Sequence, residues 1–193
     1  RKLMPDPFKL TDMEIAAKRI AQAAMKGERV AIFGDYDVDG ATSAALLAWH
    51  LRHAGLDPLI HIPDRIFEGY GPNVEAVRSL AARGATLLVT VDCGTTSLEA
   101  LAEAKALGMS VIVIDHHQCG DELPQVDALV NPNRPDDLSG SGIWPPSAWC
   151  SSRWSRSIAN CGRRGSGPIS ARSPICSARC IMSPSARWPM SRR

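Results

Sequence analysis

The sequence has no apolar run long enough to cross a membrane, and it does not open with a secretory signal peptide. We therefore expect a cytoplasmic protein that does not bind membranes. Cysteine is scarce in the first 140 residues, which contain only Cys93 and Cys119, whereas the last 53 contain four. This uneven distribution argues against a disulfide framework and fits a reducing compartment.

The last 53 residues, from Ser141 onward, lack Asp, Glu, Lys, Leu, Val, Phe and Tyr, yet they contain nine Arg, 13 Ser and four Trp. Residues 1–140 carry 13 Lys and Arg against 20 Asp and Glu, so the net charge of +2 averages two unlike segments. An Arg- and Ser-rich disordered tail that binds nucleic acid is one interpretation. The interspersed Trp, Cys, Ile and Met argue against it, because disordered tails are poor in these residues.

A slipped reading frame is the interpretation that we favour for residues 141–193. Trp and Met each have a single codon, and moving the frame back by one base turns 143–146 and 188–191 into strings that can read like an ordinary apolar core. We therefore divide the chain into an incomplete domain, 1–140, and an irregular tail, 141–193, that is out of frame or disordered. Because the first residue is Arg, we also expect natural sequence upstream to be missing.

Residues 1–140 alternate between helical and strand periodicity. We expect helices at 11–27, 41–55, 72–84 and 97–108, the first with Thr11 as N-cap, Glu14 as its capping-box partner and Gly27 at its end. Short buried strands are expected within 29–37, 57–64, 86–92 and 110–115. Strands that alternate with such helices predict an α/β fold, with a doubly wound, mainly parallel sheet. Ligands bind such sheets beyond the carboxyl ends of the strands.

Acidic and imidazole side chains follow three of these strands. They are Asp35, Asp37 and Asp39 in "GDYDVDG" (34–40), Asp92 in "VDCGTTS" (91–97), and Asp115, His116 and His117 in "DHH". One such Asp usually caps a helix, but crowded carboxylates repel each other, and a divalent cation removes that penalty. The terminal Glu of a twelve-residue calcium loop is absent. Carboxylates and imidazoles without thiolates suit Mn²⁺ or Mg²⁺, and a pair of ions about 4 Å apart would promote phosphoester hydrolysis.

Two further segments offer candidate substrate-binding residues. Thr95 and Thr96 precede a helix, so they could bind an anionic oxygen at its N-terminus or simply cap it. In the loop "PDRIFEGYGPN" (63–73), the Arg65 guanidinium could bind a phosphate and the Tyr70 ring could stack on a base, with Asn73 beside them. An ordinary Gly/Pro turn is the alternative for this loop.

Four strings, "GDYDVDGATS", "IPDRIFEGYGPN", "VDCGTTS" and "DHH", occur in this order within residues 4–140. In this the chain resembles the DHH phosphoesterases, and among them the RecJ-type exonucleases. The resemblance implies 5′ to 3′ digestion of single-stranded DNA in recombination and repair, with two Mn²⁺ or Mg²⁺ ions. It also implies a helicase and a single-strand-binding protein as partners.

The resemblance further implies roles for individual residues. The metal ligands would be Asp37, Asp39, Asp92 and His116. Asp92 would bridge the two ions and so take part in catalysis, and His117 would be catalytic through its contact with the scissile phosphate. Asp35 and Asp115 would position their neighbours.

The sequence departs from the family pattern after residue 140. Family members have a further metal-binding Asp after "DHH", and DHHA1 and OB-like domains that grip the strand. We therefore expect the chain as written to be inactive or nearly so. Two other functions stay open: a smaller DHH phosphodiesterase that acts on short oligonucleotides or cyclic dinucleotides, and a nucleic-acid-binding protein that uses the Arg-rich tail.

Overall fold

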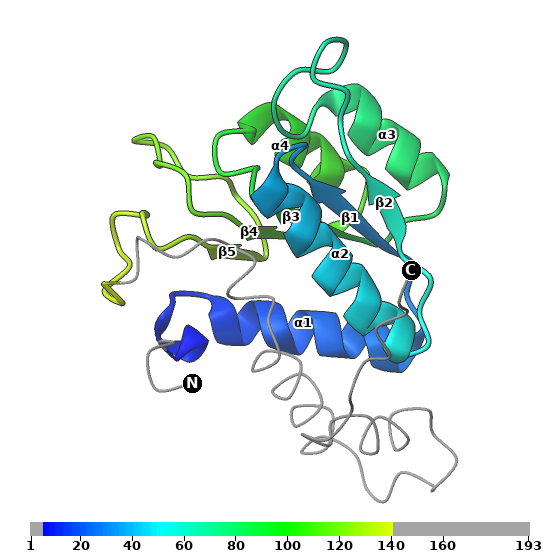
Figure 1. Cartoon of the computed structure of the whole chain (residues 1–193), viewed down its shortest axis with the longest axis horizontal. Coiled ribbons are helices and arrows are strands. Elements are labelled where there is room, and N and C mark those ends of the chain that lie inside the picture. The colour runs from blue at the N-terminus through cyan, green and yellow to red at the C-terminus, as the bar shows by residue number, and fades with distance from the viewer. Residues whose placement is uncertain (1–5, 141–193) are drawn as a thin grey trace, which may run out of the picture.

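Five short strands form one sheet in the computed structural model, which describes residues 6–140 (Figure 1). They are β1 (Val30–Gly34), β2 (Leu59–His61), β3 (Leu87–Val91), β4 (Ser110–Ile114) and β5 (Ala128–Val130). The spatial order is β2-β1-β3-β4-β5, and every neighbouring pair is parallel. The predicted parallel α/β sheet is therefore confirmed.

Helices cover both faces of this sheet. They are the 3-10 helix η1 (Pro7–Lys9) and the α-helices α1 (Met13–Lys26), α2 (Val38–His53), α3 (Val74–Ala82) and α4 (Leu98–Ala106). Alternate residues of β1 enter separate cores, because successive strand side chains point to opposite faces. Ile32 packs in the core that α1 and α2 cover, and Phe33 in the core that α3 and α4 cover. The doubly wound prediction is thus also confirmed.

The starts of α1 and α2 differ from those predicted because other residues occupy their N-cap positions. Thr11 does not cap α1: its backbone N–H donates to Asp137 Oδ2 over 2.8 Å, and the N-cap is Asp12, which has a left-handed φ of 61° and makes no side-chain cap bond. Helix α2 begins at Val38 rather than at residue 41, because Asp37 Oδ1 accepts the Gly40 N–H and caps it there. Gly27 ends α1 as predicted, with a φ of 67°.

Strand β5 was not predicted from the sequence. It has only three residues, and between β4 and β5 the structure contains a loop rather than a helix, so the strand–helix alternation gave no signal there. Asp12 completes the pairing of β5 from outside the sheet, because its Oδ2 accepts the Leu129 N–H over 3.2 Å. A side-chain bond from a distant residue, which local patterns do not report, thus supports this strand beside its backbone pairing with β4.

The predictions for the tail at 141–193, and for a missing segment before Arg1, lie outside the described residues. Within 6–140, no helix is both long enough and apolar enough to cross a membrane.

Asp127 anchors the start of β5 at the edge of the sheet opposite the carboxyl ends of the strands. Its Oδ2 accepts the Val111 N–H over 2.6 Å, and both oxygens lie 2.9 Å from Lys105 Nζ. Burial raises the pKa of this carboxyl, but the Val111 and Lys105 contacts outweigh burial, so the pKa is lowered overall.

We expect Asp127→Asn to lower the free energy of unfolding by about 1 kcal/mol near pH 7, because Asn keeps an acceptor for Val111 but loses its charge beside the partly exposed Lys105. A lowered folded pKa stabilises the fold above the pKa of an unfolded Asp, about 3.9, and this contribution is lost as the pH falls below it. Urea unfolding of both proteins at about pH 7 and about pH 3.5 tests this. A difference of equal size at both pH values would contradict it.

Candidate metal centre

The carboxyl ends of four adjacent strands deliver polar residues to one level of the sheet. Gly34 pairs with Val91, Val91 with Ile114 and Ile114 with Val130. The next residues along the chain are Asp35, Asp92, Asp115 and Asn131, and each is at most 3% exposed. Strands β1 and β3 flank the point where the winding reverses, which is where doubly wound sheets bind their ligands.

Among residues 6–140, two groups of side chains could each hold a metal ion. One comprises Asp92, His116 and His117, and the other comprises Asp35, Asp37 and Asp92, with the ligand atoms of each group within 4.8 Å of one another. Asp92 belongs to both groups. The structure therefore brings three predicted ligands together, adds Asp35 and His117 to them, and leaves Asp39 outside both groups, on the first turn of α2.

Asp92 is a buried carboxylate that accepts no hydrogen bond from the described residues. It is fully buried, both of its oxygens lack a hydrogen-bond partner, and its φ is 63°, one of two positive values at non-glycine residues in 6–140. His116 Nε2 lies 3.2 Å from Asp92 Oδ1, a distance short enough for an ion pair although the geometry does not satisfy a hydrogen bond. Burial and the neighbouring Asp37 raise the pKa of Asp92 to about 8. A cation between these groups would offset this cost.

The loop 35–40 turns tightly over the end of β1. Asp35 Oδ1 is another buried oxygen that has no hydrogen-bond partner within the described range, and burial raises the pKa of Asp35. Asp37 differs, because the hydrogen bond from the Gly40 N–H lowers its pKa. A Cβ at Gly40 would lie 2.5 Å from the backbone oxygen of Asp35. Glycine at this position therefore lets the first turn of α2 close onto Asp35.

Asp115 is as buried as Asp92, but all of its bonding capacity is used. Its Oδ1 accepts bonds from the backbone N–H groups of His116 (2.7 Å) and His117 (3.1 Å) and lies 2.7 Å from His117 Nδ1. Its Oδ2 accepts the N–H and Oγ1–H of Thr95 over 3.1 and 2.7 Å. Burial alone would raise the pKa of Asp115, but these bonds hold it at about 2. The carboxylate therefore stays charged and orients the two histidines.

Tyr70 reaches this network from the 63–73 loop. Its hydroxyl lies 3.0 Å from His117 Nδ1 and 3.4 Å from the backbone oxygen of Asp92. The rings of Tyr70 and His117 meet edge to face. Since Asp115 binds the Nδ1–H of His117, the Tyr70 proton is free to donate to the Asp92 oxygen. The same contact with Asp115 raises the pKa of His117. The sequence predicted Tyr70 as a stacking residue, whereas the structure places its hydroxyl against the histidine.

The remaining predicted substrate residues are dispersed. Arg65 lies 5.2 Å from the centroid of the Tyr36 ring, beside the Asp35 turn. Asn73 caps α3, because its Oδ1 accepts the Ala76 N–H over 2.8 Å. Thr95 is buried within the Asp115 network, and only Thr96 is exposed at the surface. Of Thr95 and Thr96, therefore, Thr96 alone is open to a ligand.

Sequence reasoning missed Asn131 and Asn133. Asn131 Nδ2 donates to Thr95 Oγ1 over 2.9 Å and to the backbone oxygen of His117 over 3.0 Å, and Asn133 Nδ2 donates to the backbone oxygen of His116. The available signal was "LVNPN" (129–133), a short apolar run that ends in amide side chains. Without a predicted fifth strand, nothing placed this string at the same edge as the aspartates.

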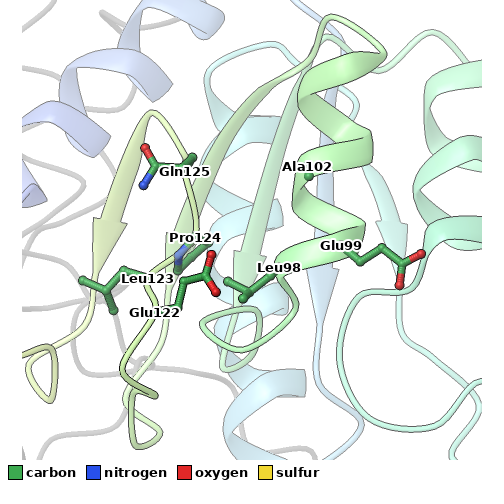
Figure 2. A pocket seen from close by; sticks show the side chains of 7 residues that line it. All are labelled: Leu98, Glu99, Ala102, Glu122, Leu123, Pro124 and Gln125. Carbon is green, nitrogen blue, oxygen red and sulfur yellow. The ribbon is translucent and has the colours of Figure 1, made fainter.

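A groove lies apart from these groups, between α4 and the segment 122–125 (Figure 2). Leu98, Glu99 and Ala102 line one side, and Figure 2 shows the Glu99 carboxylate pointing away from Glu122 on the other. None of the predicted site residues lines this groove. The candidate centre is thus the set of strand ends and not this groove.

Comparison with known families gives one match to a family model, the DHH family, N-terminal domain, over residues 29–152. The chain is 43% identical over 144 residues to the single-stranded-DNA-specific exonuclease RecJ of Bacillus subtilis (strain 168), a match that covers 72% of this chain and 18% of that protein. It is 40% identical over 141 residues to the RecJ of Escherichia coli (strain K12), covering 69% of this chain and 24% of the relative. The chain therefore spans less than a quarter of the length of these relatives.

Two solved structures share the fold. The crystal structure of an exonuclease RecJ bound to manganese matches with a TM-score of 0.65 and 33% identity, over 82% of this chain and 40% of the other. The RecJ of Thermus thermophilus in complex with Mn²⁺ matches with a TM-score of 0.57 and 26% identity, over 79% of this chain and 26% of the other.

The closeness of Gly40 to Asp35 gives a stability test of the turn. We expect Gly40→Ala to lower the free energy of unfolding by about 2 kcal/mol or more, because the added methyl group meets rigid backbone. Gly120→Ala is the matched control, since its added Cβ would have no atom within 4 Å. Urea unfolding measures both variants. Equal stability of the two would show that the turn relaxes at little cost.

Proposed function

Because the chain belongs to the DHH family, we propose that it is the metal-binding part of a RecJ-type exonuclease that hydrolyses phosphodiester bonds of single-stranded DNA in recombination and repair. One observation carries the proposal: Asp92 is fully buried, accepts no hydrogen bond from residues 6–140, and is shared by two groups of metal-capable side chains. The RecJ relatives, which are 40–43% identical to the chain, support the substrate class.

The side chains at the strand ends fit a pair of Mn²⁺ or Mg²⁺ ions. They supply carboxylate and imidazole groups without a thiolate, which is the ligand type that these ions accept. One ion would be held by Asp92, His116 and His117, and the other by Asp35, Asp37 and Asp92. Asp39 joins this set on the family pattern alone. When bound, the ions would lower the pKa of a water molecule and neutralise charge on the phosphate.

Asp115 and Tyr70 prepare the centre for hydrolysis by fixing which ring nitrogen of His117 carries a proton. Asp115 accepts the Nδ1–H of His117, so Nε2 is the ring atom left to bind a metal or a phosphate oxygen. Tyr70 supports the same ring and, through its hydroxyl, the Asp92 backbone. Asp115 is thus proposed as a positioning residue, and Asp92 and His117 as catalytic residues.

The finer assignments rest on the family resemblance. They are 5′ to 3′ polarity, a cytoplasmic location, and a helicase and a single-strand-binding protein as partners. Arg65 and Thr96, whose side chains are exposed, are proposed to contact the DNA. Arg65 suits this role because a guanidinium binds phosphate oxygens in pairs.

Asp92→Asn tests the metal proposal. We expect it to weaken Mn²⁺ binding by the full chain at least about a hundredfold, because it removes the one ligand that both groups share. Isothermal titration with MnCl₂ measures the affinity, and Asp57→Asn, an exposed acid outside both groups, is the matched control. Loss of binding in both variants, or in neither, would refute the assignment.

Hydrolysis of long single-stranded DNA, compared with that of dinucleotides and cyclic dinucleotides, tests the substrate class. Because the chain as written is expected to be inactive or nearly so, the assay uses a version in which the reading frame is restored after residue 140. With Mn²⁺ present, we expect this version to hydrolyse the long strand at a higher relative rate, and Asp92→Asn in it to abolish that hydrolysis. A preference for dinucleotides would instead identify a phosphodiesterase of short oligonucleotides.

A separate experiment tests the tail. If deletion of residues 141–193 leaves DNA binding unchanged, the tail is excluded as the source of the affinity for DNA.

A further inference from the structure

The two histidines of "DHH" lie on a loop whose backbone is bonded on both sides. Asp115 Oδ1 accepts the N–H groups of His116 and His117. The two carbonyl groups of the same residues point to the segment that follows β5, where Asn133 binds that of His116 and Asn131 binds that of His117 over 3.0 Å. All four polar groups of these two residues' backbone are therefore paired.

The side chain of Asn131 forms hydrogen bonds within the protein and is not in contact with solvent. It is fully buried, and each of its polar side-chain atoms has a partner. Nδ2 donates to Thr95 Oγ1 and to the His117 oxygen, while Oδ1 accepts the Asn133 N–H over 2.8 Å. Thr95 in turn donates to Asp115 Oδ2 over 2.7 Å. Asn131 thus acts on the histidines directly, and through Thr95 on the carboxylate that orients His117.

We propose that Asn131 and Asn133 are positioning residues that set the metal affinity of the centre by holding the backbone of His116 and His117. The inference rests on the proposed function in one respect, the identity of the ligand as a divalent metal. Partners that orient metal-binding side chains are usually worth about 10- to 100-fold in affinity.

The variants are Asn131→Ala and Asn133→Ala in the full chain. Asn133 is only partly buried, so its variant keeps the test valid where Asn131→Ala fails to fold. The matched control is Asp127→Asn, which weakens a polar anchor at the other end of β5, at a residue that does not contact the histidines. Thermal unfolding without metal measures the general stability of each variant.

Two readouts separate positioning from a merely structural role. Isothermal titration with MnCl₂ should show affinity reduced about tenfold or more in the Asn variants and unchanged in Asp127→Asn. Amide hydrogen exchange of the metal-free chain should be faster at His116 and His117 in the Asn variants, with the central strands β1 and β3 unaffected.

Unchanged Mn²⁺ affinity together with unchanged exchange at His116 and His117 would overturn the inference, even if the Asn variants were less stable. The same holds if Asp127→Asn shifts both readouts as much as the Asn variants do. Failure of the unaltered chain to bind Mn²⁺ would refute the proposed function and, with it, the claim about metal affinity. Faster exchange in the Asn variants alone would then still show that they hold the histidine backbone.

Discussion

The carboxyl group of Asp92, which is buried and has no hydrogen-bond donor among residues 6–140, is the constraint on which the rest of this structure depends. Keeping such a group ionised out of water costs several kcal/mol, which is why the pKa of Asp92 is raised, and the positive φ at Asp92 adds about 1 kcal/mol or more. The fold tolerates both costs because β3 is central and is paired along its whole length with β1 and with β4. Its end therefore cannot shift to bring Asp92 toward solvent. Since the cost falls at the point where two groups of metal-capable side chains meet, a bound cation is the simplest compensation.

Asp92 and Asp115 show how neighbours, rather than depth, decide the charge of an acid. They follow adjacent strands at the same level, and both are at most 1% exposed. Yet the pKa of Asp92 is raised to about 8, whereas that of Asp115 is held at about 2. The difference is the supply of donors, since Asp115 accepts bonds from Thr95, His116 and His117, whereas Asp92 accepts none from the part of the chain that the structure describes. Asp92 is thus available to bind a metal, whereas Asp115 orients His116 and His117.

The parts of the fold that were predicted are those that local patterns encode. An aspartate directly follows each of the three five-residue strands, so strand periodicity together with the parallel rule was enough to bring Asp35, Asp92 and Asp115 to one edge. The geometry of single side chains was not encoded in this way. Asp39 lies outside both ligand groups, and Asn73 caps a helix, because helix starts depend on which side chain caps them. Strand β5 escaped prediction because it has only three residues and follows a loop rather than a helix.

Contacts with distant residues tie the centre to the start of the chain. Asp12 Oδ2 accepts bonds from Leu129 N–H and, over 2.7 Å, from Arg134, so it holds both ends of the segment that carries Asn131 and Asn133. Asp12 lies before the region that matches the family model, which begins at residue 29. Asp12 has a left-handed φ, and its side chain turns to β5 instead of capping α1. The backbone of the histidine loop thus depends, through β5, on a residue more than a hundred positions earlier.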